Sequence, residues 1–381
     1  MQQIKQSTIQ PIHLHIVCLD VPYPPDYGGV FDLFYKIKAL HQLGVKIHLH
    51  CFEYGRGEQP ELNQYCEEVN YYKRNKSLKG ILSRLPYIVS SRISSQLIKN
   101  ILKDNYPVLL EGIHCTYCLY NGDFKNRKVL VRLHNVEFEY YHQLALSTKH
   151  LFKKNWFAIE SKLLKSYENK IAEKAKFVTV NEKDKLTYEN IFSAKDINFL
   201  PVFLPFDEVG SLTGKGTFCL YHGNLSVAEN EKAIVWLLEN VFNDSEIDFT
   251  IAGKNPTKFL RNQVSKNKKA RLVENPSDGK MRELIKNAHI HLLPSFNTTG
   301  IKIKLLNALF NGRFIITNAA SIDGTGLETL CKIAEDSIDY KNTIRQLMQV
   351  SFEQEEINKR NEILKREYDN NKNATQLMKW L

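Results

Sequence analysis

The sequence lacks several features that would assign it to a familiar class. It has no run of 18 apolar residues, so it predicts no membrane-spanning helix. Residues 1–11 contain no apolar stretch of the kind found in a secretory signal peptide. The seven cysteines are scattered, and Cys18, Cys51 and Cys219 fall within expected strands. Buried free thiols in a reducing compartment explain this distribution better than disulfides do, so we expect a cytoplasmic protein.

Motifs that mark several enzyme classes are also absent. The chain has no G-x-G-x-x-G fingerprint, which disfavours a nicotinamide cofactor. It has no P-loop and no G-x-S-x-G sequence, which disfavours the corresponding nucleotide and serine hydrolases. The single C-x-x-C, Cys115–Cys118, lacks the second cysteine pair that a zinc site would need, and structural thiols explain it better than a redox role.

The overall composition is that of a globular protein with a basic balance. The chain has 381 residues, of which 43% are hydrophobic and 25% charged, and this length suits two domains. The formal net charge is +10. No nucleic-acid recognition module accompanies it, so nucleic acid is not an expected partner. A phosphorylated substrate or an anionic membrane surface would fit the charge, and so would a merely basic protein.

The first part of the chain alternates between strand-like and helix-like segments. Residues 12–19 are rich in apolar and β-branched side chains, a helical pattern covers 30–44, and a second strand covers 45–52. This β-α-β unit implies a parallel sheet. The further elements expected here are strands at 68–72, 108–112, 128–133 and 177–180, a long helical region over about 138–174, and a helix at 181–192 capped by Asn181.

A second β-α series follows a cluster of prolines and glycines between residues 201 and 216, which indicates a linker. The sequence therefore predicts three parts, at 1–204, 205–350 and 351–381, the last a polar helical tail that packs on another element. The expected architecture is two Rossmann-like, doubly wound α/β domains that face each other across a cleft. Ligands of such sheets bind at the carboxyl ends of the strands.

Two polar constellations follow strands of the first domain. In P-P-D-Y-G-G, Gly28 and Gly29 let backbone N–H groups approach a ligand, and the following helix adds its positive end. A tight turn with no ligand explains these residues as well. In V-R-L-H-N-V-E, His134 follows a buried strand, where it could bond a sugar hydroxyl or assist proton movement. The alternative is a loop histidine whose hydrogen bonds are satisfied locally.

Two further constellations fall in the second domain. Gly223 and Asn224 end its first strand, where ordinary strand-to-helix punctuation is the simpler explanation. The segment from Gly300 onward places Lys302 and Lys304 beside a helix N-terminus, which is a favourable place for an anionic group. Lys302 alternates with apolar residues and so fits a solvated basic face. Lys304 is therefore the stronger candidate for a diphosphate ligand.

Together these segments resemble glycosyltransferases of the two-Rossmann-domain type, GT-B, in the bacterial group related to families 4 and 1. P-P-D-Y-G-G-V is similar to the group's first glycine-rich loop, and R-L-H-N-V-E-F-E-Y-Y is similar to a His-Asn segment of bacterial sugar transferases. H-G-N-L-S-V-A-E-N-E-K-A-I-V-W-L is similar to the start of the donor domain. The most specific match is G-I-K-I-K-L-L-N-A-L-F-N-G-R-F-I-I-T-N, which is similar to G-x-K-x-K-x-x-E-A-x-x-x-G-x-P-x-V-x-T.

The resemblance implies transfer of a sugar from a UDP- or GDP-linked donor to an acceptor hydroxyl, with retention of configuration and with neither a cofactor nor a bound metal. Residues 1–204 would form the acceptor side and 205–350 the donor domain, with the helices of 351–381 crossing back to the first domain. Carried over by motif, His134 and Lys304 would be catalytic. The donor-binding residues would be Gly28, Gly29, Gly223, Asn224, Gly300, Lys302 and Asn307.

Two departures keep other functions open. Asn307 stands where the group usually has glutamate, and Arg313 where proline is more usual. An amide can still accept a hydrogen bond from a ribose but carries no charge. A catalytically silent GT-B-like partner protein therefore remains an alternative, and a nucleotide-sugar 2-epimerase is a weaker one.

The expected partners are a nucleotide-sugar, a glycan or lipid-linked acceptor, and an anionic membrane surface. The last would meet the basic and apolar segment 72–92, which a solvated basic helix pair also explains. The expected location is the cytoplasm, with peripheral contact at the inner face of the plasma membrane.

Overall fold

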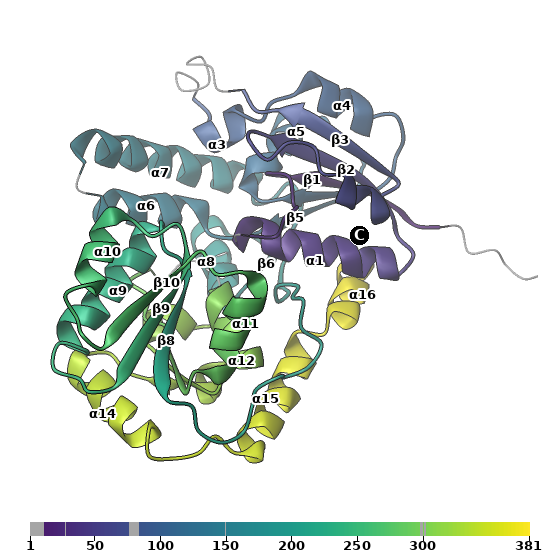
Figure 1. Cartoon of the computed structure of the whole chain (residues 1–381). Coiled ribbons are helices and arrows are strands. Elements are labelled where there is room, and N and C mark those ends of the chain that lie inside the picture. The colour runs from purple at the N-terminus through teal and green to yellow at the C-terminus, as the bar shows by residue number, and fades with distance from the viewer. Residues whose placement is uncertain (1–10, 27, 76–83, 149, 298–299, 301) are drawn as a thin grey trace, which may run out of the picture. The chain divides into compact units, whose positions relative to one another are not determined.

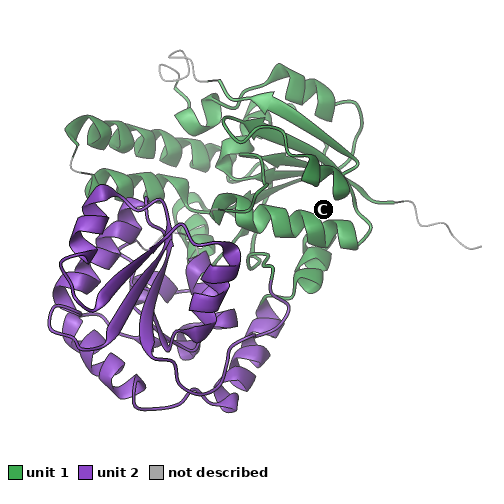
Figure 2. Cartoon of the chain, in the orientation of Figure 1, with its two compact units in different colours: residues 1–205, 368–381 green, residues 206–367 purple. Residues whose placement is uncertain are grey.

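The computed structural model describes residues 11–26, 28–75, 84–148, 150–297, 300 and 302–381, and it divides into two compact units. The first unit combines Met1–Pro205 with Tyr368–Leu381, and the second is Phe206–Glu367 (Figure 2). In the described residues, no helix has both the length and the apolar character needed to cross a bilayer. Part of the basic segment 72–92, residues 76–83, lies outside the described residues.

The first unit is built on a seven-stranded sheet in which every neighbouring pair is parallel, with the order β3-β2-β1-β4-β5-β6-β7 (Figure 1). Successive residues of the central strands belong to different apolar clusters on the two faces of the sheet. Both faces are therefore buried, as the near-continuous apolar runs predict. The strands are β1 (His13–Cys18), β2 (Lys46–Glu53), β3 (Glu68–Lys73), β4 (Val108–Glu111), β5 (Val129–Leu133), β6 (Lys176–Thr179) and β7 (Ile197–Phe199).

Helices cover this sheet. Asn181 caps one of them as the sequence predicts, because its side chain accepts a hydrogen bond from the backbone N–H of Asp184 at 2.7 Å. The last helix packs against the first through Ala374 and Leu377. The helices are α1 (Gly28–Gln42), α3 (Tyr87–Ser90), α4 (Ser95–Ile101), α5 (Tyr117–Asn121), α6 (Glu137–Ser147), α7 (Leu151–Ile171), α8 (Glu182–Phe192) and α16 (Asn370–Trp380).

The second unit has a six-stranded parallel sheet with the order β10-β9-β8-β11-β12-β13. Its strands are β8 (Phe218–Asn224), β9 (Asp248–Lys254), β10 (Ala270–Glu274), β11 (Ile290–Leu292), β12 (Phe314–Thr317) and β13 (Lys332–Ile333). Its helices are α9 (Ala228–Asn240), α10 (Lys258–Val264), α11 (Asp278–Asn287), α12 (Ile303–Asn311), α13 (Ala319–Ile322), α14 (Ser337–Leu347) and α15 (Gln354–Glu367). In Figure 1, α9 and α10 cover one face of the sheet and α11 and α12 the other.

Each sheet therefore has helices on both faces and a strand order that reverses next to its first strand, which confirms the prediction of two doubly wound α/β domains. In the first unit the reversal lies between β1 and β4, and in the second between β8 and β11. The loops at the carboxyl ends of such a strand pair leave in opposite directions, and the crevice between them is where open α/β sheets bind ligands.

Candidate active site

Most of the residues singled out from the sequence lie around these two switch points. In the first unit, α1 follows β1, and Glu111 is the last residue of β4. In the second unit, Gly223 and Asn224 end β8, and the segment Ser295–Gly300 follows β11. Each unit carries its own cluster of polar side chains.

A buried ion-pair network lies at the switch point of the first unit. The ammonium of Lys36 lies 2.9 Å from a carboxylate oxygen of Asp32 and 2.7 Å from one of Glu111. All three side chains are almost fully buried. Asp32 and Lys36 are four residues apart on α1, so they share one face of the helix. Burial alone would raise the pKa of either carboxyl, but the surrounding positive charge and hydrogen bonds, with Lys36 the largest among them, together outweigh burial and hold the pKa of both Asp32 and Glu111 below the ordinary values.

Arg132 completes the charge balance of this network. Its guanidinium lies 3.4 Å from Asp32 and donates to the carbonyl oxygens of Thr179, Leu200 and Pro201. The residue lies inside β5 and is fully buried. Two carboxylates thus face two cations, and Arg132 ties β5 to the chain that follows β7, which makes it a structural residue.

His134 lies directly after β5 and contacts the network through Glu111. Its Nε2 is 3.0 Å from Glu111 Oε2, and 11% of its side chain is exposed. An ionised carboxylate only accepts hydrogen bonds, so Nε2 must carry a proton and donate it. The neutral ring therefore presents Nδ1 as an acceptor. Glu111 fixes both the tautomer and the orientation of the one imidazole that sequence patterning selected.

Gly28 and Gly29 form the first turn of α1. Gly28 is exposed and Gly29 half-buried, while the neighbouring Tyr27 lies outside the described residues. The first N–H groups of a helix have no partner within the helix, and they carry its positive end. The two glycines therefore offer backbone donors with no side chain to block an approaching anion, and their binding of a donor stays a prediction.

The second unit's cluster centres on Lys304 in the first turn of α12. Its ammonium donates to the hydroxyl of Tyr221 at 2.7 Å and to Oδ1 of Asn230 at 2.8 Å, and it lies 4.6 Å from the centre of the Tyr221 ring. Burial lowers its pKa to about 8, although the carboxylate of Glu229 opposes the shift. These bonds use two of the three N–H donors. Lys304 is thus a desolvated cation held at the end of β8.

Gly223 and Asn224 lie beside this lysine. Gly223 has φ of +154°, and a Cβ there would come within 3.5 Å of the Asn230 amide and 3.8 Å of Lys304 Cδ. The carbonyl of Asn224 accepts from Asn230 Nδ2 at 2.8 Å, and its side chain accepts from Ser226. Asn224 thus helps to hold Asn230, and its side chain shapes the loop that follows β8.

Lys302 and Gly300 precede α12. Gly300 has φ of +64°, a conformation that glycine adopts without strain, and its neighbours 298–299 and 301 lie outside the described residues. The ammonium of Lys302 lies 3.8 Å from Glu229, whose carboxylate also accepts from Ser295 Oγ at 2.5 Å. The two predicted lysines therefore differ: Lys304 faces Tyr221 at the end of β8, whereas Lys302 already has a carboxylate counterion.

Asn307, which stands where a glutamate is usual, lies one turn further along α12. Its Oδ1 accepts a hydrogen bond from Asn311 Nδ2 at 3.0 Å. Arg313, the second departure, is largely buried and donates to the carbonyl oxygens of Lys286 and Ala288 at the end of α11. The arginine therefore ties β12 to α11, and its role is structural.

The sequence patterns do not identify the residues that orient His134 and Lys304. Glu111 ends the apolar run V-L-L-E-G, and Lys36 and Asp32 lie within an otherwise apolar helix face. A charged residue within an apolar run indicates a buried ion pair. The sequence does not reveal its partner, because the paired residues lie far apart in the chain. Tyr221 was read only as part of a strand, and Asn230 only as a residue near a helix start.

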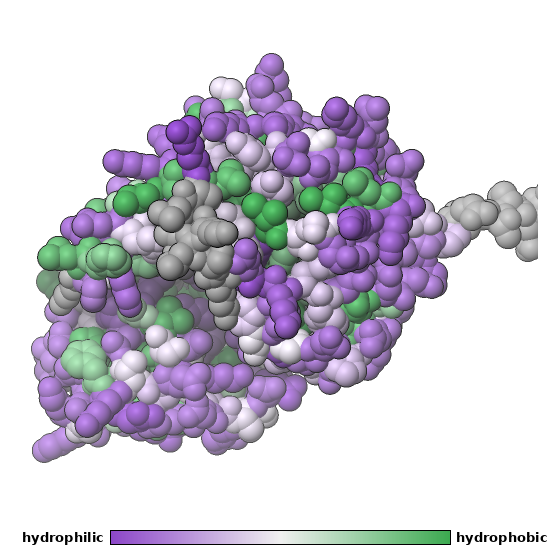
Figure 3. All heavy atoms as spheres, turned by 90° about the horizontal axis from the view of Figure 1, so that it is seen from above, coloured by the Kyte–Doolittle hydropathy of each residue, from purple (hydrophilic) through white to green (hydrophobic). Residues whose placement is uncertain are grey.

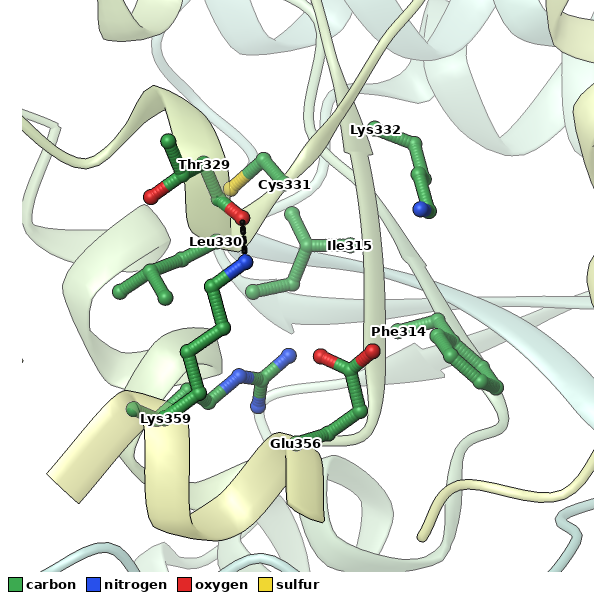
Figure 4. Close-up of a pocket in the computed structure, with 9 residues that line it drawn as sticks. Phe314, Ile315, Thr329, Leu330, Cys331, Lys332, Glu356 and Lys359 are labelled. Atoms are coloured by element: carbon green, nitrogen blue, oxygen red, sulfur yellow. Dashed lines mark hydrogen bonds between the residues drawn. The ribbon is translucent and has the colours of Figure 1, made fainter.

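Metal ligation points to no other site in the described parts of the chain. Asp32, Glu111 and His134 form the single group there whose ligand atoms lie close enough for a metal ion, but Lys36 bridges the two carboxylates. A cavity of about 50 Å³ lies between β12, β13 and α15 (Figure 4). It is far too small for a nucleotide-sugar. Burial raises the pKa of Cys331 in its wall to about 12, so that thiol is no nucleophile.

Comparisons with known proteins bear on the family of the second unit and on the fold. Residues 216–349 match the family described as Glycosyl transferases group 1. Over 375 residues the chain is 27% identical to an uncharacterized 44.6 kDa protein in the cps region of Klebsiella pneumoniae, covering 88% of this chain and 93% of the relative.

Solved structures share the fold at low sequence identity. A TarM variant of S. aureus, in complex with Fondaparinux, alpha-GlcNAc-glycerol and UDP, matches with a TM-score of 0.67 and 11% identity over 97% of this chain and 99% of that chain. HepE of Anabaena in complex with UDP-glucose matches with a TM-score of 0.66 and 10% identity over 97% and 100%. A glycosyltransferase from Rickettsia africae matches with a TM-score of 0.64 and 14% identity over 97% and 98%.

Proposed function

We propose that this chain, a member of the group 1 glycosyl transferases with the GT-B fold, moves a sugar from a UDP- or GDP-linked donor to an acceptor hydroxyl. The observation that carries the proposal is Lys304, a desolvated cation held by Tyr221 and Asn230 at the switch point of the second sheet. The bond between the anomeric carbon and the diphosphate breaks, and the nucleoside diphosphate leaves with the electron pair. The acceptor oxygen forms the new bond, and the proton of the acceptor hydroxyl passes to the departing diphosphate.

Lys304 stabilises the departing diphosphate in this proposal. Negative charge grows on the leaving group in the transition state, and a half-buried, partly desolvated cation interacts with it more strongly than a fully solvated one. The N-terminus of α12 adds backbone donors nearby. Gly223 places no side chain beside Asn230 and Lys304, so the diphosphate can approach the backbone there.

In the first unit, His134 binds the transferred sugar. With Nε2 committed to Glu111, its Nδ1 accepts a hydrogen bond from a sugar hydroxyl. In the same unit, the backbone donors of Gly28 and Gly29 at the start of α1 offer a place where an anion can bind. His134 and Lys304 remain the two side chains that we assign to catalysis.

The residues around His134 and Lys304 also fit a transfer that retains the anomeric configuration and uses no metal ion. The acidic pair nearest to His134 is neutralised by Lys36 and Arg132, so it offers neither a free nucleophile nor an open metal site. Lysine and helix-end donors would neutralise the diphosphate instead. A retaining transferase whose transition state resembles an oxocarbenium ion is therefore our proposal.

A role in surface polysaccharide or glycan synthesis is supported by the relative in a cps region and by the UDP and sugar ligands of the similar structures. The acceptor would be a glycan or a lipid-linked glycan. Such an acceptor would place the protein in the cytoplasm, in peripheral contact with the inner face of the plasma membrane.

A panel of nucleotides and nucleotide-sugars, read out by thermal shift, tests the donor assignment. We expect a UDP or GDP compound to raise the melting temperature, and Lys304→Ala to abolish the effect. Lys268→Ala is the control, since this exposed lysine is in the same unit. If no nucleotide shifts the wild-type protein, the donor assignment is wrong.

The silent-partner alternative is favoured by one observation, the hydrogen bond that turns the Asn307 amide toward Asn311. Such a protein would bind no donor productively and would act in complex with another transferase. Slow release of free sugar from any nucleotide-sugar, lost in Lys304→Ala, would exclude it. Conversion of the donor alone to its epimer would instead indicate a 2-epimerase.

A further inference from the structure

Helices α6 and α7 of the first unit form an antiparallel hairpin, in which the two helices pack along each other (Figure 1). Helix α6 ends at Ser147 and α7 begins at Leu151. Lys149, in the connection, lies outside the described residues. At its base the hairpin is anchored by Glu168, whose carboxylate accepts from the backbone N–H groups of Glu137 and Phe138.

The free end of the hairpin carries large apolar side chains in contact with solvent. Phe152 is 81% exposed and Leu151 is 76% exposed, which makes them the two most exposed large apolar residues in the described parts of the chain. Leu146 at the end of α6 is 62% exposed. Figure 3 shows apolar residues gathered at the left edge of that view, over the end of the hairpin. Singly exposed apolar residues are ordinary, but a cluster at one tip marks an interaction surface.

The exposed apolar side chains continue along one face of α7. Ile159 is 58% exposed and lies seven residues after Phe152 and eight after Leu151, so the three residues share a face. The buried residues of α7, Leu164 and Tyr167 among them, fall on the opposite side. This second apolar face is therefore turned away from the core that the helix already serves.

The charge of the hairpin surface has a single sign. Three of its four acidic residues, Glu137, Glu160 and Glu168, are buried, and Glu139 is half-buried. All the described lysines of the two helices are exposed: Lys153, Lys154, Lys162, Lys165 and Lys170. The sequence places Lys153 and Lys154 directly after Phe152, so the apolar end is bordered by positive charge.

We propose that the end of the α6–α7 hairpin docks on an anionic lipid surface, with Leu151 and Phe152 entering the interface and the lysines pairing with lipid phosphates. An apolar face bordered by lysines is the pattern of interfacial helices, and each lysine near an anionic bilayer adds attraction. A second copy of this chain is disfavoured as the occupant, since two such ends would bring like charges together. The hairpin end is then the part of the protein that makes the membrane contact of the proposed function. Only the biological reason for this contact rests on the proposed function, because lipid binding itself requires no catalysis.

Co-sedimentation with vesicles tests the proposal. The wild-type protein should bind vesicles of phosphatidylcholine mixed with phosphatidylglycerol, bind phosphatidylcholine alone weakly, and dissociate with added salt. The double variant Leu151→Ser/Phe152→Ser should bind the anionic vesicles roughly tenfold or more weakly, because two apolar anchors are lost. Lys153→Glu/Lys154→Glu should abolish the preference for anionic lipid. The control is Ile338→Ser, which removes an apolar side chain of similar exposure, 67%, from the second unit.

Further readouts separate the possible failures. These positions are exposed, so melting temperatures should stay within a few degrees of the wild-type value. Donor hydrolysis in solution should be the same in the wild-type protein and the double serine variant. If neither protein hydrolyses the donor but the wild-type protein binds anionic vesicles, the proposed function is wrong and the docking proposal is supported. Equal vesicle binding by both would overturn docking, as would binding to an acidic protein but to no anionic vesicle, or a change of oligomeric state as the main effect.

Discussion

Glu111 Oε2 lies 3.0 Å from His134 Nε2, and the other oxygen of the same carboxylate lies 2.7 Å from Lys36 Nζ. One buried carboxylate thus orients the imidazole while a buried lysine keeps that carboxylate ionised. Glu111 comes from β4, His134 follows β5, and Lys36 comes from α1. Three elements therefore determine how a single ring is presented at the carboxyl end of the sheet.

The first prediction concerns this pair. Glu111→Gln leaves a neutral amide that can present its N–H to His134, so the imidazole loses its fixed tautomer. We expect the transfer rate to fall about 10- to 100-fold, the size of effect seen when an orienting partner is removed. The KM for the donor should change little. Initial rates against donor concentration would separate the two effects.

Two controls belong to that experiment. Glu173→Gln changes an exposed glutamate of the same unit and should leave the rate unchanged. A merely structural role for Glu111 would lower the melting temperature of Glu111→Gln and change the KM for the donor together with the rate. Our expectation is instead a fall in kcat with little change in KM, because the His134 imidazole is no longer oriented by a carboxylate.

The second prediction concerns proton uptake at Lys304. Burial lowers its pKa to about 8, and a bound diphosphate raises that pKa again by favouring the charged form. Below pH 8 the lysine is already charged and nothing changes on binding. Above pH 8, binding must take up a proton, so affinity for a nucleoside diphosphate should fall up to about tenfold per pH unit. Titration calorimetry in buffers of different ionisation enthalpy would detect the proton.

In Lys304→Arg the charge persists at every accessible pH, so the linked proton should vanish even if affinity drops. Affinity that stays constant from pH 7 to pH 9.5 in the wild-type protein would contradict the assignment of Lys304 to the diphosphate.

The third prediction concerns buried histidines on β1 and β2. His15 Nδ1 lies 2.9 Å from His50 Nε2, and His50 Nδ1 lies 2.8 Å from the hydroxyl of Tyr72. Burial lowers the pKa of both histidines, that of His50 to about 3. The unfolded chain therefore binds more protons than the folded chain at acidic pH. Stability is fully present above pH 6.5 and is lost as the pH falls toward 3.

Between pH 6.5 and pH 3, His50 alone costs up to about 1.4 kcal/mol of the free energy of unfolding per pH unit, and His15 contributes in the same direction. Chemical unfolding at pH 7.5 and pH 5 measures the loss. His50→Gln should be less stable at pH 7.5 but lose less on acidification, whereas the exposed His142→Gln should behave like the wild-type protein. An identical loss in His50→Gln would show that these histidines do not cause the acid sensitivity.

The fourth prediction concerns the close approach of β8 and β9. Gly253 pairs with Gly223, and a Cβ at Gly253 would overlap the carbonyl oxygen of Gly223 and the side chain of Leu225. Gly253→Ala should therefore destabilise the second unit by about 1–3 kcal/mol and disturb the loop beside Lys304. Gly279→Ala on α11 meets no atom within 4 Å and serves as the control. Melting temperatures and nucleotide-induced shifts of the two variants decide the matter.

The sequence alone determined the local organisation of this protein. Apolar runs separated by amphipathic helices specify parallel strands buried on both faces, so the two α/β domains follow from periodicity. Residues placed directly after strands, such as His134 and Gly223, were recognisable because the polar or glycine residue interrupts an apolar run. The G-I-K-I-K segment was recognisable for the same reason. These are local signals, in which the relevant residues are neighbours in the chain.

Only the tertiary structure decided which of these residues matter together. Strand order depends on pairings between distant segments, and it is the central place of β1 and β8 that puts their loops at the switch points. Glu111 meets His134 across 23 residues and Lys36 across 75, while Lys304 meets Tyr221 across 83. Burial then sets the strength of those charges. No local pattern encodes the burial of Lys304, because the desolvation that lowers its pKa comes from packing between elements far apart in the sequence.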